Sequence, residues 1–180
     1  GYDSKETGRV AAAHLIDRGL TPVACVTGSL RSADGRLRYE GYREALVEAH
    51  EKFRPDIVYE GHFRREDGYK ALHHFSKLPE FPRSIVCCND YTAFGVYLAA
   101  EELNLNIPRD ISVMGCDNVP SSALISPKLS TVNFDNYKIG EMLVDLVLRR
   151  IRTPDAEQRV LRMKPSLIAR ESTGAVSART

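Results

Sequence analysis

Short apolar runs alternate with longer segments of helical periodicity along most of this chain. Runs such as residues 22–27 and 84–88 are too short for a helix, and their apolar, β-branched character is typical of strands covered on both faces. When strands and helices alternate, each helix crosses over to the next strand and the strands pair in parallel. The sequence therefore predicts an α/β fold with a doubly wound, mostly parallel sheet and helices on both faces.

The same patterns give the expected elements. Strands are expected at residues 22–27, 56–59, 84–88, 111–115, 129–133, 159–163 and 166–169, and helices at residues 3–18, 36–50, 67–77, 91–103 and 137–151. Asp3 and Glu6 have capping-box spacing at the start of the first helix, and Asp90 is placed as the cap of the fourth. The last helix is strongly amphipathic. Its apolar stripe consists of Ile139, Met142, Leu143, Leu146 and Val147.

Composition excludes several classes of protein. A chain of 180 residues that is 43% hydrophobic and 27% charged has enough apolar surface for a core. Its 25 Lys and Arg against 24 Asp and Glu provide no field that would hold DNA. No apolar run approaches the roughly 18–20 residues of a membrane span, and no signal segment opens the chain. We therefore expect a cytoplasmic protein with no membrane partner.

Signals for catalysis, metals and cofactors are weak. Cys25, Cys87, Cys88 and Cys116 form no CxxC motif, and they are expected to be reduced, buried thiols. The chain contains no HExxH, GxSxG, GxGxxG or phosphate-binding loop motif. The sequence therefore predicts neither an enzyme nor a metal or cofactor site.

Polar and aromatic residues follow the first four predicted strands. They are Arg36, Phe63, Asn89 and Asp117, and in an open α/β sheet ligands bind beyond the carboxyl ends of the strands. A guanidinium, an amide and a carboxylate can bond the hydroxyls of a sugar, while an aromatic ring covers its apolar face. This group predicts a sugar-binding site.

The residues alone leave other interpretations open. Asn89 and Asp117 also suit turns, and Phe63 also suits a buried loop anchor. Arg38 fits a surface or helix-dipole partner as well as a functional group, and Asp90 fits a helix cap better than a binding residue.

Five stretches in unbroken order resemble one family, the lactose-repressor/galactose-repressor family of bacterial transcription regulators. They are residues 28–42 with RLRYEGY, residues 88–95 (CNDYTAFG), residues 107–118 (IPRDISVMGCDN), residues 127–132 (PKLSTV) and residues 167–173 (LIAREST). The resemblance implies a type I periplasmic-binding-protein-like effector domain of two subdomains. Residues 1–131 would form the main part of the C-terminal subdomain, 132–159 a segment returning to the N-terminal subdomain, and 160–180 the last strands and tail. No helix-turn-helix is present.

The resemblance also implies roles for individual residues. Arg36, Asn89 and Asp117 match sugar-hydroxyl contacts of the family, and Phe63 matches its aromatic platform. Asn89 favours a carbohydrate, because a purine-sensing relative lacks the amide there. Cys116 departs from the family, which usually has a larger apolar residue at this position.

The function expected from the resemblance is effector sensing. A small molecule, most simply a sugar, would shift the affinity of a separate helix-turn-helix domain for operator DNA. A homodimer is expected through Tyr97, Leu124 and Ile125. The alternative is a sugar-binding protein of a transport system with the same fold.

Overall fold

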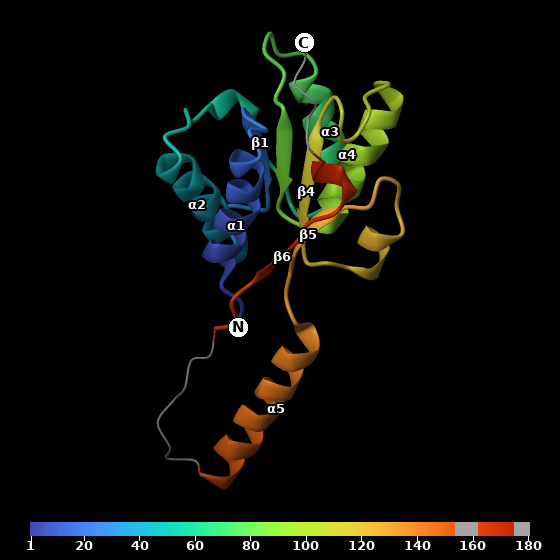
Figure 1. Ribbon diagram of the computed structural model, residues 1–180. Coiled ribbons are helices and arrows are strands. Elements are labelled where there is room, and N and C mark those ends of the chain that lie inside the picture. The colour runs from blue at the N-terminus through green and yellow to red at the C-terminus, as the bar shows by residue number, and fades with distance from the viewer. Residues whose placement is uncertain (154–161, 175–180) are drawn as a thin grey trace.

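A computed structural model, described for residues 1–153 and 162–174, contains one six-stranded sheet in the order β2-β1-β3-β4-β5-β6 (Figure 1). The first five strands pair in parallel and β6 is antiparallel to β5. The strands are β1 (Val23–Thr27), β2 (Val58–Glu60), β3 (Ser84–Cys87), β4 (Ser112–Cys116), β5 (Ser130–Asn133) and β6 (Ser166–Ile168). The predicted doubly wound, mostly parallel sheet is confirmed.

Five α-helices and three short 3₁₀ helices complete the described chain. They are α1 (Ser4–Asp17), α2 (Ala33–Glu48), α3 (Arg65–Phe75), α4 (Asp90–Glu102), α5 (Asn136–Arg152), η1 (Pro55–Ile57), η2 (Pro120–Ala123) and η3 (Glu171–Thr173). In Figure 1, α1 and α2 lie on one side of the sheet and α3 and α4 on the other.

Side chains of the central strands alternate between two cores. In β1, Ala24 and Val26 pack with the core on the α3 and α4 side, whereas Val23 and Cys25 pack with the core on the α1 and α2 side. Successive side chains of a strand point to opposite faces of the sheet, so a strand that is buried on both faces has a continuous run of apolar residues. This arrangement explains why the short apolar runs identified the strands.

The starts of α2 and α4, which carry candidate residues, differ from the prediction. Helix α2 begins at Ala33 rather than near residue 36, because the Ser32 side chain accepts a hydrogen bond from Gly35 N at 3.0 Å. Helix α4 is capped by Asn89, whose Oδ1 accepts from Thr92 N at 2.8 Å. The predicted cap, Asp90, is instead the first residue of the helix, and its side chain is buried.

Helix α5 projects away from the rest of the molecule (Figure 1). Of its predicted stripe, Ile139 is buried, whereas Leu143 and Val147 are more than half exposed. Most of its apolar face is therefore uncovered by this chain. No helix in the described ranges is long and apolar enough to cross a membrane. The predicted strand at residues 159–163 lies largely outside the described residues.

Candidate functional site

The carboxyl ends of β1, β3 and β4 lie side by side in the sheet, and the candidate residues gather there. Asn89 follows β3, Asp117 follows β4, and Phe63 lies in the connection after β2. Because neighbouring strands are parallel, the segments that follow them begin at the same edge of the sheet. The structure brings these three predicted residues to one rim.

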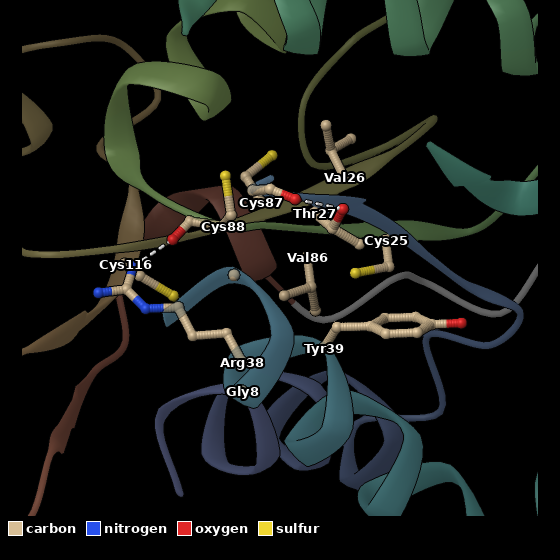
Figure 2. A pocket seen from close by; sticks show the side chains of 12 residues that line it. Gly8, Cys25, Val26, Thr27, Arg38, Tyr39, Val86, Cys87, Cys88 and Cys116 are labelled. Atoms are coloured by element: carbon tan, nitrogen blue, oxygen red, sulfur yellow. Dashed lines mark hydrogen bonds between the residues drawn. The ribbon is translucent and has the colours of Figure 1, made fainter. Parts of the chain in front are cut away.

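Arg38 supplies the guanidinium of this rim. It lies on α2 with its side chain only 12% exposed, and its Nη2 donates to Asp117 Oδ1 at 3.2 Å. Its Nη1 donates to the carbonyl oxygen of Cys88, the residue before Asn89 (Figure 2). The guanidinium also lies over the Phe134 ring, 5.5 Å from its centroid. From its place on α2, Arg38 thus contacts the residues that directly follow β3 and β4.

Arg36 does not lie in this group, which differs from the sequence-based prediction. Its side chain is 54% exposed and its Nε lies 3.8 Å from Glu40 Oε1. Arg36 is part of α2 and lies on the solvent side of the helix. Counting from the Ser32 cap, Arg38 falls three residues after buried Gly35 and four before buried Tyr42, so helical periodicity was the signal that could have identified it.

Asp117 sits in an unusual backbone conformation. Its φ is +106° and that of Asn118 is +51°, so two consecutive non-glycine residues have left-handed backbone angles. Asp117 N donates to Val132 O at 2.9 Å, which keeps the turn joined to β5. Burial raises the pKa of the Asp117 carboxyl, and Arg38 opposes that shift. Within the described part of the chain, Oδ2 of this carboxyl accepts no hydrogen bond, so it remains available.

Asn89 serves two structural contacts at the rim. Besides capping α4 through Oδ1, its Nδ2 donates to the Phe63 carbonyl oxygen at 3.1 Å. Asn89 therefore has the capping role that the sequence analysis assigned to Asp90. An amide has two N–H groups and two lone pairs, so one donor and one acceptor remain for a ligand.

Phe63 forms a flat apolar surface at the rim. Its φ is +65°, and its ring lies against the backbone of Gly28 after β1. A Cβ at Gly28 would lie 2.1 Å from Phe63 Cζ, so only glycine leaves room for the ring. The side chain is half-buried and presents its remaining surface to solvent.

A small cavity behind Arg38 is lined by thiols. Cys25, Cys88 and Cys116 line it together with Arg38 (Figure 2). Burial raises the pKa of Cys88 to about 11 and raises those of Cys25 and Cys116 as well. These thiols are therefore neutral near pH 7. In residues 1–153 and 162–174, no group of His, Cys, Asp and Glu is arranged to hold a metal ion.

Arg38 Nε is buried without a hydrogen-bond partner among the residues that the structure describes. A buried donor left unpaired costs about 1–3 kcal/mol. Nη1 and Nη2 each carry two N–H groups, and each donates one of them to the protein, to Cys88 O and to Asp117 Oδ1. The site therefore contains guanidinium N–H groups and a carboxylate oxygen that these bonds do not use.

The residues predicted for a dimer interface lie apart from this rim. Tyr97 and Ile125 pack partly against the core, and the Tyr97 hydroxyl donates to Pro127 O at 2.9 Å. Leu124 is 83% exposed. Of these three residues, only Leu124 has a side chain that is almost entirely exposed.

Comparisons with known proteins place this geometry among regulators. Residues 12–173 match the sequence family described as a periplasmic binding protein-like domain. The chain is 37% identical over 169 residues to the HTH-type transcriptional repressor PurR of Pasteurella multocida (strain Pm70), covering 94% of this chain and 51% of that protein. It is 35% identical over 165 residues to the PurR repressor of Serratia proteamaculans (strain 568), covering 92% of this chain and 48% of that protein. The chain thus spans about half the length of the curated relatives it matches.

Two ligand-bound structures share the fold. A LacI family transcriptional regulator from Enterococcus faecium with bound ribose superimposes with a TM-score of 0.90 at 27% identity, covering 98% of this chain and 65% of that one. A transcriptional regulator CelR–cellobiose complex superimposes with a TM-score of 0.89 at 25% identity, covering 95% of this chain and 52% of that one.

Proposed function

This chain belongs to the periplasmic binding protein-like family, as an effector-domain segment of a regulator of the lactose-repressor/galactose-repressor type, and on that premise we propose that it binds a sugar effector. The binding groups are Arg38, Asn89, Asp117 and Phe63. Arg38 takes the role that the sequence assigned to Arg36.

The observation that carries the proposal is the pairing of unused polar groups with an exposed ring face at one rim. Asp117 Oδ2 can accept from one hydroxyl while a second N–H of Arg38 Nη1 or Nη2 donates to an oxygen of the same ligand. Asn89 keeps one donor and one acceptor for a neighbouring hydroxyl. Phe63 covers an apolar C–H face. This combination fits a polyhydroxylated ring, and two neighbours in the comparison carry ribose and cellobiose.

The regulatory role extends the same proposal to the whole protein. In this proposal, the described residues 1–131 and 162–174 form part of one subdomain, and residues from 132 onward lead to a second subdomain that completes the site; the rest of the expected segments 132–159 and 160–180 lies outside the described residues. Sugar binding between the two would shift the affinity of a helix-turn-helix domain for operator DNA in the cytoplasm. A homodimer through Tyr97, Leu124 and Ile125 is part of this proposal, whereas catalysis is not.

The transport alternative uses the same fold and the same type of ligand. The curated relatives favour the regulator, because they are transcriptional repressors at up to 37% identity across nearly the whole chain. The two roles differ in what the ligand controls, since only a regulator changes its DNA affinity when the sugar binds.

The test is an NMR titration of the full-length protein, in which the second subdomain completes the site, with D-ribose, with cellobiose and with hypoxanthine as a purine. We expect a sugar to shift the amide signals of residues 38, 63, 89 and 117. Arg38→Ala should weaken that binding by roughly 30-fold or more, because it leaves Asp117 and the ligand without their donor. Arg36→Ala is the matched control, because it also removes an arginine from α2, and it should leave sugar binding unchanged. Binding of hypoxanthine but neither sugar would contradict the sugar assignment.

A further inference from the structure

Asp90 is a buried carboxyl group that the proposed binding site does not use. It directly follows Asn89 as the first residue of α4, and its side chain is fully buried. The helix is capped by Asn89, so Asp90 is not needed there. A buried carboxyl group requires hydrogen-bond partners, and those of Asp90 lie on other elements.

The partners of Asp90 belong to the turn after β4 and to β5. Its Oδ2 accepts from Val119 N at 2.9 Å, and its Oδ1 accepts from the Thr131 hydroxyl at 2.7 Å. Thr131 Oγ1 in turn accepts from Asn118 N at 3.2 Å. These three bonds fasten residues 118 and 119 to α4 and β5.

The strand beside Asp90 leaves space for the carboxyl group. A Cβ at Gly115 in β4 would lie 2.2 Å from Asp90 Oδ1. Any other residue at position 115 would displace the carboxyl from Thr131. Gly115 and Asp90 are therefore a matched pair.

The turn that these bonds fasten carries Asp117. Two consecutive left-handed residues are strained, and they persist only where the surroundings fix them. Arg170 also holds the turn, because its Nη2 donates to Asn118 Oδ1 at 2.7 Å. With the turn in this geometry, Asp117 meets Arg38 at 3.2 Å.

We propose that Asp90 is a positioning residue of the effector site, which acts through Val119 and Thr131 to hold Asp117 where it pairs with Arg38 and faces the effector. The inference rests on the proposed function, because the contact between Asp117 and the effector is itself part of that proposal. It adds a residue that touches no ligand and links the binding rim to β5, the strand from which the chain leaves the sheet toward α5.

The test uses threonine and aspartate variants with a matched control. Thr131→Val removes the hydroxyl at nearly constant shape, and Thr131→Ser restores it. Asp90→Leu removes both acceptors. Ser84→Ala is the control, because it deletes another buried hydroxyl bond, from Ser84 Oγ to Leu20 O at 2.7 Å, at the opposite end of the sheet.

Two quantities are measured in each variant by NMR. Amide hydrogen exchange at Asn118 and Val119 reports the turn, and the Kd for D-ribose reports the site. We expect Thr131→Val to speed exchange at Asn118 and to weaken D-ribose binding, each by about tenfold, the equivalent of one lost hydrogen bond. Asp90→Leu should do the same at Val119. Thr131→Ser should match the wild type, and Ser84→Ala should lower stability without either effect.

Unchanged exchange at Asn118 and Val119 in Thr131→Val and Asp90→Leu would overturn the inference, as would equal changes in Ser84→Ala. If Asp90→Leu does not fold, the Thr131 pair decides. If wild-type protein binds no D-ribose, the failure concerns the choice of sugar in the proposed function, and the exchange measurement alone decides whether Asp90 holds the turn.

Discussion

At the scale of single residues, the central feature is a partly buried ion pair at the mouth of a site. Arg38 is held by the Cys88 carbonyl and by Asp117, and its Nη1 and Nη2 each keep a second N–H that these bonds do not use. A guanidinium fixed in this way is ready to bind oxygen atoms without losing further side-chain entropy. The pair therefore both shapes the site and supplies its polarity.

Asp117→Asn tests the carboxylate of this ion pair. The amide keeps the shape but removes the negative charge that faces Arg38 and the sugar hydroxyls. We expect sugar binding to weaken by about 2–4 kcal/mol. Phe63→Ala should cost less, about 1–2 kcal/mol, because the ring contributes mainly apolar contact. Isothermal titration calorimetry with D-ribose measures both, and wild-type affinity in Asp117→Asn would remove this residue from the site.

The Asp90 carboxyl makes stability depend on pH. Burial, the largest effect, raises its pKa from 3.8 to about 7, with a smaller contribution from the charge of Asp117 and against the bonds from Thr131 and Val119 and the charge of Arg170, which lower it. Between these two values the folded chain holds a proton that the unfolded chain has lost. Stability therefore falls as pH rises, by at most about 1.4 kcal/mol per pH unit.

Asp90→Asn does not titrate and serves as the reference for this effect. Urea unfolding of both proteins from pH 4 to pH 8 measures the difference. We expect the free energy of unfolding of the wild type to decrease relative to Asp90→Asn up to about pH 7 and then to level off. A difference that stays constant with pH would contradict the assignment.

The kinds of binding group were predictable from sequence, but their individual identities were only partly so. Phe63, Asn89 and Asp117 follow strands, and strand ends are visible in the apolar runs. Arg36 and Arg38 share one helix, and choosing between them requires the phase of that helix, which depends on the Ser32 cap. Asn89 and Asp90 are adjacent acceptors, and only the packing under Gly115 determines which one turns inward.

At the scale of elements, close contact between α1 and α2 fixes the position of Arg38. A Cβ at Gly8 in α1 would lie 1.8 Å from the Arg38 carbonyl oxygen, so the two helix backbones touch. Hydrophobic periodicity predicted both helices, because each buries one face against the sheet. The contact distance between them was not visible in that periodicity, since it depends on which glycines face one another.

Two glycine substitutions distinguish the effect of this contact on stability from the effect of helix propensity. Gly8→Ala should destabilise the chain by about 1–3 kcal/mol, because the methyl group forces α1 away from α2. Gly140→Ala on α5 meets no atom within 4 Å, and it should stabilise the chain by up to about 1 kcal/mol. Urea unfolding measures both, and equal effects of the two substitutions would show that the helices do not touch here.

At the scale of the whole molecule, two of the exposed apolar features among the described residues bear on assembly. They are the stripe on α5 and Leu124, which directly follows η2. Amphipathicity predicted the stripe, but no pattern within the sequence states what packs against it. The assignment of α5 to a second subdomain therefore comes from the family resemblance and not from periodicity.

Leu124→Glu tests the proposed dimer. Leu124 is 83% exposed, and a charge there should break an apolar contact between two copies. Val47→Glu is the matched control, because Val47 is 71% exposed on α2, outside the proposed interface. Light scattering at tens of micromolar should give a dimer for the wild type and Val47→Glu and a monomer for Leu124→Glu. A monomeric wild type would contradict the proposed interface.

The sugar-binding rim is tested most directly by the NMR titration with D-ribose and cellobiose in three proteins: wild type, Arg38→Ala and Arg36→Ala. The proposed site predicts saturable shifts at residues 38, 63, 89 and 117 with the same Kd in the wild type and in Arg36→Ala, and a Kd at least roughly 30-fold higher in Arg38→Ala. A wild-type Kd in Arg38→Ala, or shifts that map to another surface, would contradict it.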